Sequence, residues 1–157
     1  MRLLIKQRVF SWGDTYDIYD EAGNVKYIVK AEIFAFGHQL HVYDANNNEI
    51  GQVREKLFTF TPKFEIVMDD IVKGTIIKEW TFFIPKYDID FNGWHVEGDF
   101  FNWNYEVYEN GFPIMHINKE ILTWGDTYVI DFESSSHELM GVMLVVAIDA
   151  ANCSKKD

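Results

Sequence analysis

Side chains that could bind a metal ion are concentrated in the segment DANNNEIGQVRE, residues 44–55. Their spacing resembles that of a calcium-binding loop, with candidate oxygen ligands at Asp44, Asn46, Asn48 and Glu55. The sixth position of such a loop requires Gly, whereas this chain has Glu49, and we expect a strand rather than a helix to follow. An Asx-rich hairpin turn is the favoured interpretation, and a calcium site is the alternative.

The sulfur and imidazole groups of the chain give a weaker signal for metal binding or catalysis. His38 and His41 flank a predicted turn and could share a metal ion, but the sequence shows no third ligand for it. We expect surface or strand positions for these two and for the other histidines, which are His95, His116 and His137. The only cysteine, Cys153, has no recognisable catalytic context. We therefore predict no cofactor.

A paired-carboxylate site is a third possibility, because the pentapeptide WGDTY occurs twice, at residues 12–16 and 124–128. Asp14 and Asp126 occupy the same position in the two copies. Their carboxylates, with the hydroxyls of Thr15 and Thr127, are expected to cap turn amides; a shared ligand site is the alternative. With no general acid or nucleophile motif nearby, we do not predict catalysis there.

The two copies belong to a larger repeat, which defines the elements that hold these candidate residues. A triplet of an aromatic residue, a large apolar residue four positions later and a β-branched residue two further on occurs six times. The triplets are Trp12-Tyr16-Ile18, Phe36-Leu40-Val42, Phe60-Phe64-Ile66, Phe83-Tyr87-Ile89, Phe101-Tyr105-Val107 and Trp124-Tyr128-Ile130. A unit of about 24 residues is too short for a βαβ motif but fits two strands and two turns.

Turn residues separate the repeats at regular intervals, including Asn92-Gly93 and Asn110-Gly111, which are strong hairpin signals. The pattern predicts six hairpins, or about twelve antiparallel strands, between residues 3 and 132. The first and last hairpins are then neighbours, and the two WGDTY copies either meet at that seam or are simply the two repeats that diverged least.

The C-terminal segment departs from this pattern. Ser135 and Glu138 form a capping-box sequence, and Asn152 is a plausible C-terminal cap, so we predict a helix over about residues 136–151. The run LMGVMLVVAI carries no charge, which indicates a helix that is surrounded on all sides. Asp149 interrupts this character, and it either reaches solvent at the barrel mouth or is buried with a partner.

A barrel can surround such a helix. Twelve strands ~4.8 Å apart and tilted by ~40° form a barrel of radius ~12 Å, whose side chains leave room for one helix of ~10–12 Å diameter. We therefore predict a mainly β fold: a closed antiparallel barrel of about twelve strands around a central hydrophobic C-terminal helix, as a single domain over residues 1–157.

Composition limits the classes of partner. The net charge of −11 disfavours nucleic acid and, on average, repels an anionic bilayer. The longest apolar run is too short to cross a membrane as a helix, the N-terminus does not resemble a signal peptide, and the single cysteine suits a reducing compartment. We expect a cytoplasmic protein with no transmembrane span.

Several segments resemble the bacterial, YxjI-like branch of the LURP-one-related family, which is grouped with Tubby C-terminal domains and phospholipid scramblases. They are FSWGDTYDIYDEAGN, FGHQLHVYD, NGWHVEGDFFNWNYEVY, LTWGDTYVID and VVAIDA, and the resemblance covers essentially the whole chain. It implies a twelve-stranded barrel around a central hydrophobic helix. It implies little chemistry, because bacterial members of this type are of unclear function.

Three functions follow as hypotheses. The first is a non-catalytic binding or scaffold domain that contacts a protein or membrane-lipid partner through its rim loops. The second is a carrier of a lipid or small molecule in a groove between helix and barrel. The third is an enzyme, for which the sequence offers no phosphate-binding loop, nucleophile elbow or zinc spacing.

Overall fold

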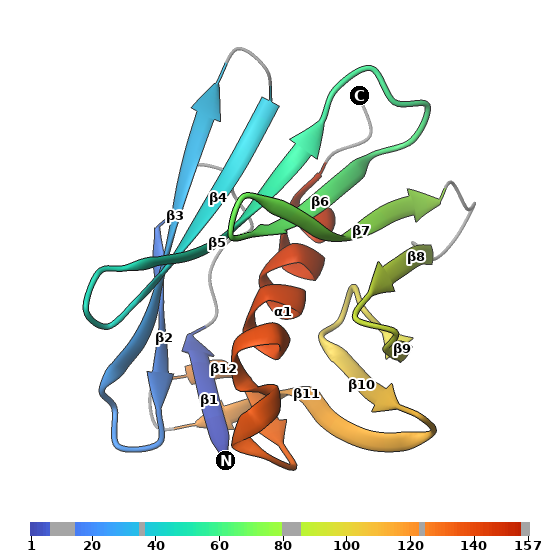
Figure 1. The fold of residues 1–157 in the computed structure, drawn as a ribbon. Coiled ribbons are helices and arrows are strands. Elements are labelled where there is room, and N and C mark those ends of the chain that lie inside the picture. The colour runs from blue at the N-terminus through green and yellow to red at the C-terminus, as the bar shows by residue number, and fades with distance from the viewer. Residues whose placement is uncertain (7–14, 35–36, 80–85, 123–124, 155–157) are drawn as a thin grey trace.

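Twelve antiparallel strands surround one helix in the computed structural model, which describes residues 1–6, 15–34, 37–79, 86–122 and 125–154 (Figure 1). The strands are β1 (Arg2–Lys6), β2 (Tyr16–Asp20), β3 (Val25–Phe34), β4 (Gly37–Asp44), β5 (Glu49–Lys56), β6 (Lys63–Met68), β7 (Ile71–Glu79), β8 (Lys86–Phe91), β9 (His95–Asp99), β10 (Asn104–Glu109), β11 (Phe112–Leu122) and β12 (Gly125–Phe132). A short 3₁₀ turn, η1 (Ser135–His137), leads into helix α1 (Glu138–Cys153).

The strands form one sheet in the order β8-β7-β6-β5-β4-β3-β2-β1-β12-β11-β10-β9. The predicted twelve-stranded antiparallel barrel around a C-terminal helix is confirmed, with one refinement. Among the described residues, β8 and β9 do not pair, so the barrel is nearly closed rather than continuous.

The first and last strands of the sheet meet where β1 pairs with β12, as the meander requires. Leu3 lies opposite Ile130, and the Arg2 guanidinium donates to both carboxylate oxygens of Asp131 at 2.8 and 3.2 Å. Met1 and Phe132 also exchange backbone hydrogen bonds. Most of the first WGDTY copy lies outside the described residues, so the proposed meeting of the two copies stays a prediction.

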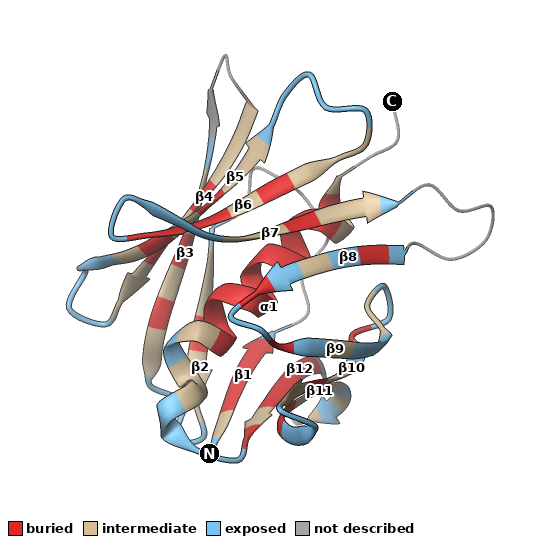
Figure 2. Ribbon diagram, turned by 45° about the vertical axis from the view of Figure 1, so that its right-hand side comes forward, coloured by how far each residue is buried: buried red, intermediate tan, exposed pale blue. Residues whose placement is uncertain are grey.

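Helix α1 fills the barrel, and every residue from 141 to 151 is buried (Figure 2). It packs against β5, β6 and β7, and the inward residues of the sequence repeat surround it. Leu40, Val42, Phe64, Ile66, Tyr105, Val107 and Ile130 are all buried. The second and third positions of the repeated triplet therefore mark side chains that face the helix.

Both boundaries of the helix differ slightly from the prediction. Ser134 rather than Ser135 supplies the side-chain cap, to η1, and α1 begins at Glu138 without a side-chain cap from His137. The C-terminal cap is Ser154, and Asn152 lies inside the last turn, where its amide has other partners. Lys155 and Lys156 lie outside the described residues. No described helix has both the length and the apolar character needed to cross a bilayer.

The barrel has two chemically different ends. At the proximal end, where the chain and α1 begin, the strand connections are acidic and rich in Asn and Gly, such as DEAGN (20–24) and DANNN (44–48). At the distal end, where α1 finishes, lie the C-terminal ends of β1, β3, β5, β7, β9 and β11 and, among the described residues, the connections that follow β5 and β9.

Candidate functional site

The connection between β5 and β6 projects two aromatic side chains from the distal end of the barrel. Phe58 and Phe60 are 103 % and 98 % exposed, so both rings stand almost entirely in solvent. The Thr59 hydroxyl donates to the carbonyls of Thr61, at 2.7 Å, and Lys56, at 3.3 Å, which fixes the turn between the two rings. The backbone of Phe58 has a φ of 60°, a costly conformation for a bulky residue.

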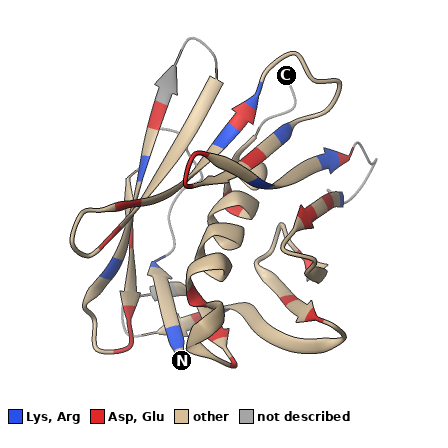
Figure 3. Ribbon diagram, viewed as in Figure 1, with Lys and Arg blue, Asp and Glu red and all other residues tan. Residues whose placement is uncertain are grey.

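Lysines flank the exposed rings. Lys56 ends β5 and Lys63 begins β6. Figure 3 shows blue, the colour of Lys and Arg, on both strands where they meet the projecting connection. The Lys56 ammonium lies 3.5 Å from the Glu65 carboxylate, and its side chain is still 49 % exposed. The connection thus combines an apolar tip with a cationic base.

The last turns of α1 carry polar groups into the distal part of the core. Asp149 is 1 % exposed, and its Oδ2 accepts a hydrogen bond from the Tyr16 hydroxyl at 3.3 Å. Of the two alternatives for Asp149, the structure shows the buried one. Burial raises the pKa of Tyr105, and the nearby Asp149 carboxylate adds to that effect.

Lys78, near the end of β7, caps the C-terminus of α1 with its side chain. Its ammonium donates to the Ser154 carbonyl at 3.0 Å and to the Ala151 carbonyl at 3.4 Å. Burial lowers the pKa of Lys78. A cation at this position satisfies terminal carbonyls and complements the helix dipole.

Asn152 connects the two strands that do not pair with one another. The Tyr87 hydroxyl on β8 donates to Asn152 Oδ1, and Asn152 Nδ2 donates to the Phe100 carbonyl, just after β9, at 2.9 Å. The rings of Tyr87 and Phe100 pack with centroids 5.4 Å apart. The distal end of the opening between β8 and β9 is therefore held at a fixed width.

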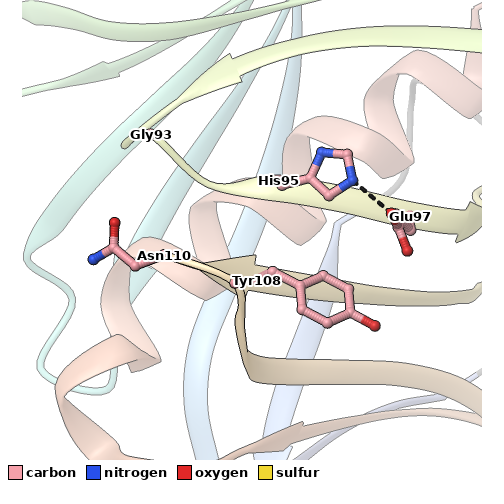
Figure 4. Close-up of a pocket in the computed structure, with 6 residues that line it drawn as sticks. Gly93, His95, Glu97, Tyr108 and Asn110 are labelled. Carbon is pink, nitrogen blue, oxygen red and sulfur yellow. Dashed lines mark hydrogen bonds and ion pairs between the residues drawn. The ribbon is translucent and has the colours of Figure 1, made fainter.

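A shallow pocket of about 560 Å³ lies on β9 and β10, next to the turns that join β8 to β9 and β10 to β11 (Figure 4). It is lined by Gly93, His95, Glu97, Tyr108, Asn110 and Gly111. His95 Nε2 lies 2.7 Å from Glu97 Oε1, and the His95 and Tyr108 rings are 6.3 Å apart. The Tyr108 hydroxyl donates to Glu106 Oε2, which raises the pKa of the phenol.

The Glu109 carboxylate, at the end of β10, connects the turn before β9 to η1 at the start of the helix. The Trp94 indole donates to Glu109 Oε1 at 3.1 Å, and His137 Nε2 lies 3.2 Å from Glu109 Oε2. Both hydrogen bonds lower the pKa of Glu109, and the bond from the Trp94 indole has the larger effect. The connections at the open side of the barrel are thus fastened to η1.

The candidate calcium ligands are not brought together. The Asp44 carboxylate accepts hydrogen bonds from the backbone N–H groups of Asn46 and Asn48, both at 2.9 Å. This is the geometry of an Asx turn. Because β5 runs fully extended from Glu49, Glu55 lies toward the opposite end of the barrel, 2.7 Å from His38. Among the described residues, no group of three His, Cys, Asp or Glu side chains could hold a metal ion.

The other candidate positions are also separated. The predicted turn between His38 and His41 is wrong, because both lie in β4. They are three residues apart on this strand, so their side chains leave opposite faces of the sheet. His41 contacts Glu49 at 2.7 Å and Glu32 at 3.1 Å. Asp14 lies outside the described residues, and Asp126 lies in β12 opposite Ile121.

Two features of the structure were not singled out from the sequence. Phe60 entered only as a repeat position, although KLFTFTPK, with apolar residues inside a turn and lysines around it, contains the relevant signal. The pocket beside Tyr108 was missed because two turns distant in sequence form it. Its only sequence signal is the pair of Asn-Gly turns.

Comparison with known proteins identifies the family. A sequence profile described as LURP-one-related matches residues 1–149. The chain belongs to the LURP-one-related family. This finding confirms the family resemblance of the segments that contain WGDTY and of the other segments quoted with them.

One LURP-one-related match is the uncharacterized protein YxjI of Bacillus subtilis, which is 24 % identical over 157 residues, covering 100 % of this chain and 97 % of YxjI. Among solved structures, an X-ray structure of an Arabidopsis thaliana protein matches with a TM-score of 0.63 and 15 % identity. That match covers 96 % of this chain and 90 % of the plant protein. The structural likeness supports the fold.

Proposed function

We propose that this LURP-one-related chain is a non-catalytic domain that docks on a membrane surface through the distal connection between β5 and β6. The observation that carries the proposal is the pair of phenylalanines, Phe58 and Phe60, exposed at the tip of one connection. Isolated exposed apolar residues are common on proteins, but two large aromatic rings in solvent on one projecting turn are costly unless a partner covers them.

A bilayer surface suits both parts of this connection. Burying a phenylalanine ring in an apolar environment contributes ~1.5–3 kcal/mol, and each lysine near an anionic lipid surface adds about 1 kcal/mol. Lys56 and Lys63 stand at the base of the turn, where they would reach headgroups once the rings are inserted. Amphipathic elements of this kind bury their apolar part ~5–10 Å into the interface.

Part of the negative charge behind the net −11 lies far from the membrane in this orientation, whereas Glu55 and Glu65 lie close to the distal lysines. Acidic turns such as Asp20-Glu21, Asp44 and Asp69-Asp70 lie at the proximal end, and strands of about eight residues separate them from the distal end by ~20 Å. This separation exceeds the Debye length of about 8 Å at physiological salt. Repulsion from these turns would therefore be largely screened.

The carrier hypothesis has less support, because α1 occupies the barrel interior where a ligand would otherwise bind. The binding hypothesis requires no catalytic group, and the exposed connection between β5 and β6 supplies the contact surface.

Liposome flotation tests the proposal. The intact chain is expected to float with vesicles that contain anionic phosphatidylglycerol. In the double variant Phe58→Ser/Phe60→Ser, the partition coefficient is expected to fall about 100-fold, which corresponds to ~3 kcal/mol. The matched control is Ile71→Ser/Phe112→Ser, which removes two exposed apolar side chains (56 % and 72 %) from the proximal end and should float like the parent chain. Failure of the parent chain to bind any vesicle, or equal loss in both variants, would refute the proposal.

A further inference from the structure

The opening between β8 and β9 leaves two strand edges that no described strand covers. Asn92 and Gly93, with φ of 55° and 68°, form the tight turn between them, and the Trp94 amide donates to the Phe91 carbonyl at 3.0 Å. Beyond this bond the strands diverge, and Figure 2 shows α1 behind the opening. Along such edges, backbone N–H and C=O groups are available to a further strand.

The edge of β9 lacks two of the residue types that commonly prevent strand addition. Its sequence, HVEGD, contains neither Lys nor Pro, and residues His95 to Glu97 precede Gly98, whose φ of 131° ends the regular extended backbone. Asn152 fixes the distal width of the opening through Tyr87 and Phe100. A preorganised edge lowers the ordering cost of binding.

Charge around the opening selects the partner. Asp88 and Asp90 are exposed on β8, and Glu97 is exposed on β9, where it lines the pocket over Tyr108. Glu106 contributes a second carboxylate on the Tyr108 side of that pocket. Because successive residues of a strand alternate between faces, a strand added to β9 would place every second side chain on the outer face, beside this pocket.

We propose that the open edge of β9 binds an extended basic peptide, and that one arginine of this peptide enters the pocket formed by His95, Glu97 and Tyr108. Backbone pairing with β9 supplies affinity, as in other cases of strand addition. The planar guanidinium stacks on the Tyr108 ring and pairs with the Glu97 carboxylate, which gives the site its preference for arginine.

Fluorescence anisotropy with a labelled synthetic peptide tests this inference. The probe is a peptide of about eight residues in which Arg alternates with Val or Thr, a pattern that favours an extended strand. One control peptide replaces Arg by Glu, and a second replaces two Val or Thr residues by Pro, which removes backbone donors and keeps the charge. The protein variants are Glu97→Lys and, as a matched charge reversal on β2, Asp17→Lys.

We expect the Arg peptide to bind with a dissociation constant in the micromolar range. Affinity should fall at least tenfold for the Pro peptide and for Glu97→Lys, and should change less than threefold for Asp17→Lys. Equal binding of the Pro and Arg peptides would show general charge attraction and overturn strand addition. An unchanged affinity in Glu97→Lys would overturn the pocket, and no binding of the Arg peptide would overturn both. Because Phe58→Ser/Phe60→Ser leaves this edge intact, it should bind the peptide normally, which separates this test from the membrane test.

Discussion

The hydroxyl group of Tyr16, at the first residue of β2, donates a hydrogen bond to the buried carboxylate of Asp149 in α1, at 3.3 Å. The two residues are 133 positions apart, so the bond forms only when the barrel has wrapped around the helix. It also links a member of the sequence repeat to the one acidic residue in the buried part of the helix. The pair is therefore a sensitive probe of how the helix sits in the barrel.

Removing this bond should destabilise the fold. Tyr16→Phe is expected to lower the free energy of unfolding by about 1–2 kcal/mol, because the buried Asp149 carboxylate loses the hydrogen bond from this hydroxyl. Urea unfolding measures the change, and a cycle with Asp149→Asn should give a coupling energy of at least ~0.5 kcal/mol. Tyr19→Phe is the control, since its hydroxyl donates to the partly exposed Asp17 carboxylate at 3.4 Å and not to the buried helix. A coupling energy of zero would contradict the prediction.

Lys78 should stabilise the C-terminal turn of α1. Replacing it by Met keeps most of the side-chain volume but leaves the carbonyls of Ala151 and Ser154 without this cation. We expect the free energy of unfolding to fall by about 1–2 kcal/mol and amide exchange to accelerate at the end of the helix. The matched control is Lys73→Met, an exposed lysine on the same strand, which should change stability by less than about 0.5 kcal/mol. Equal effects of the two substitutions would argue against capping.

Gly141 should resist substitution although it lies in a helix. A Cβ atom added there would collide with Phe132 Cε1 and would meet Met115 Sδ at 2.7 Å. The helix-propensity gain of Gly141→Ala, about 1 kcal/mol, is outweighed by overpacking, and we expect a net loss of ~1–3 kcal/mol. The same substitution in a Phe132→Leu background should cost less, because the nearest ring is gone. Thermal unfolding of the four proteins provides the comparison, and a net gain in the parent background would refute it.

Acid should weaken the attachment between Glu109 and η1. Hydrogen bonds from Trp94 and His137 lower the pKa of Glu109 below its ordinary value of 4.5. A carboxylate whose folded pKa is depressed stabilises the fold above its unfolded pKa, and this contribution disappears as the pH falls through the folded pKa. Urea unfolding from neutral pH downward should therefore show a smaller acid-induced loss in Glu109→Gln than in the parent chain. Glu133→Gln, an exposed control, should follow the parent curve; identical curves for all three proteins would contradict the assignment.

Asn152 should control the opening between β8 and β9. Asn152→Ala removes both hydrogen bonds that join Tyr87 to Phe100 through the helix. We expect faster amide exchange in β8 and β9 than in β4 and β5, because the loss is local to the open side. Hydrogen exchange with mass spectrometry measures this difference. A uniform increase over all strands would indicate global destabilisation instead.

Much of the fold could be predicted because the signals are local and repeated. The inward residue of a strand is set by a period of two, and turns such as Asn92-Gly93 depend on backbone conformations that few residue types adopt. The uncharged run before Asp149 required a surrounding structure, which only the barrel could supply. The capping positions were off by one or two residues, since Ser134 and Ser135 are chemically equivalent candidates.

The sequence by itself determined the strand pairs, the inward-facing residues and the need for an enclosed helix, because each depends on a few neighbouring residues. Only the tertiary structure decided that the ring opens between β8 and β9, that Tyr16 reaches Asp149, and that Phe58 and Phe60 stand in solvent. These features depend on how all the strands close around the helix, so no local pattern specifies them. The distances between residues far apart in the chain are fixed only when the packing of the whole barrel is satisfied.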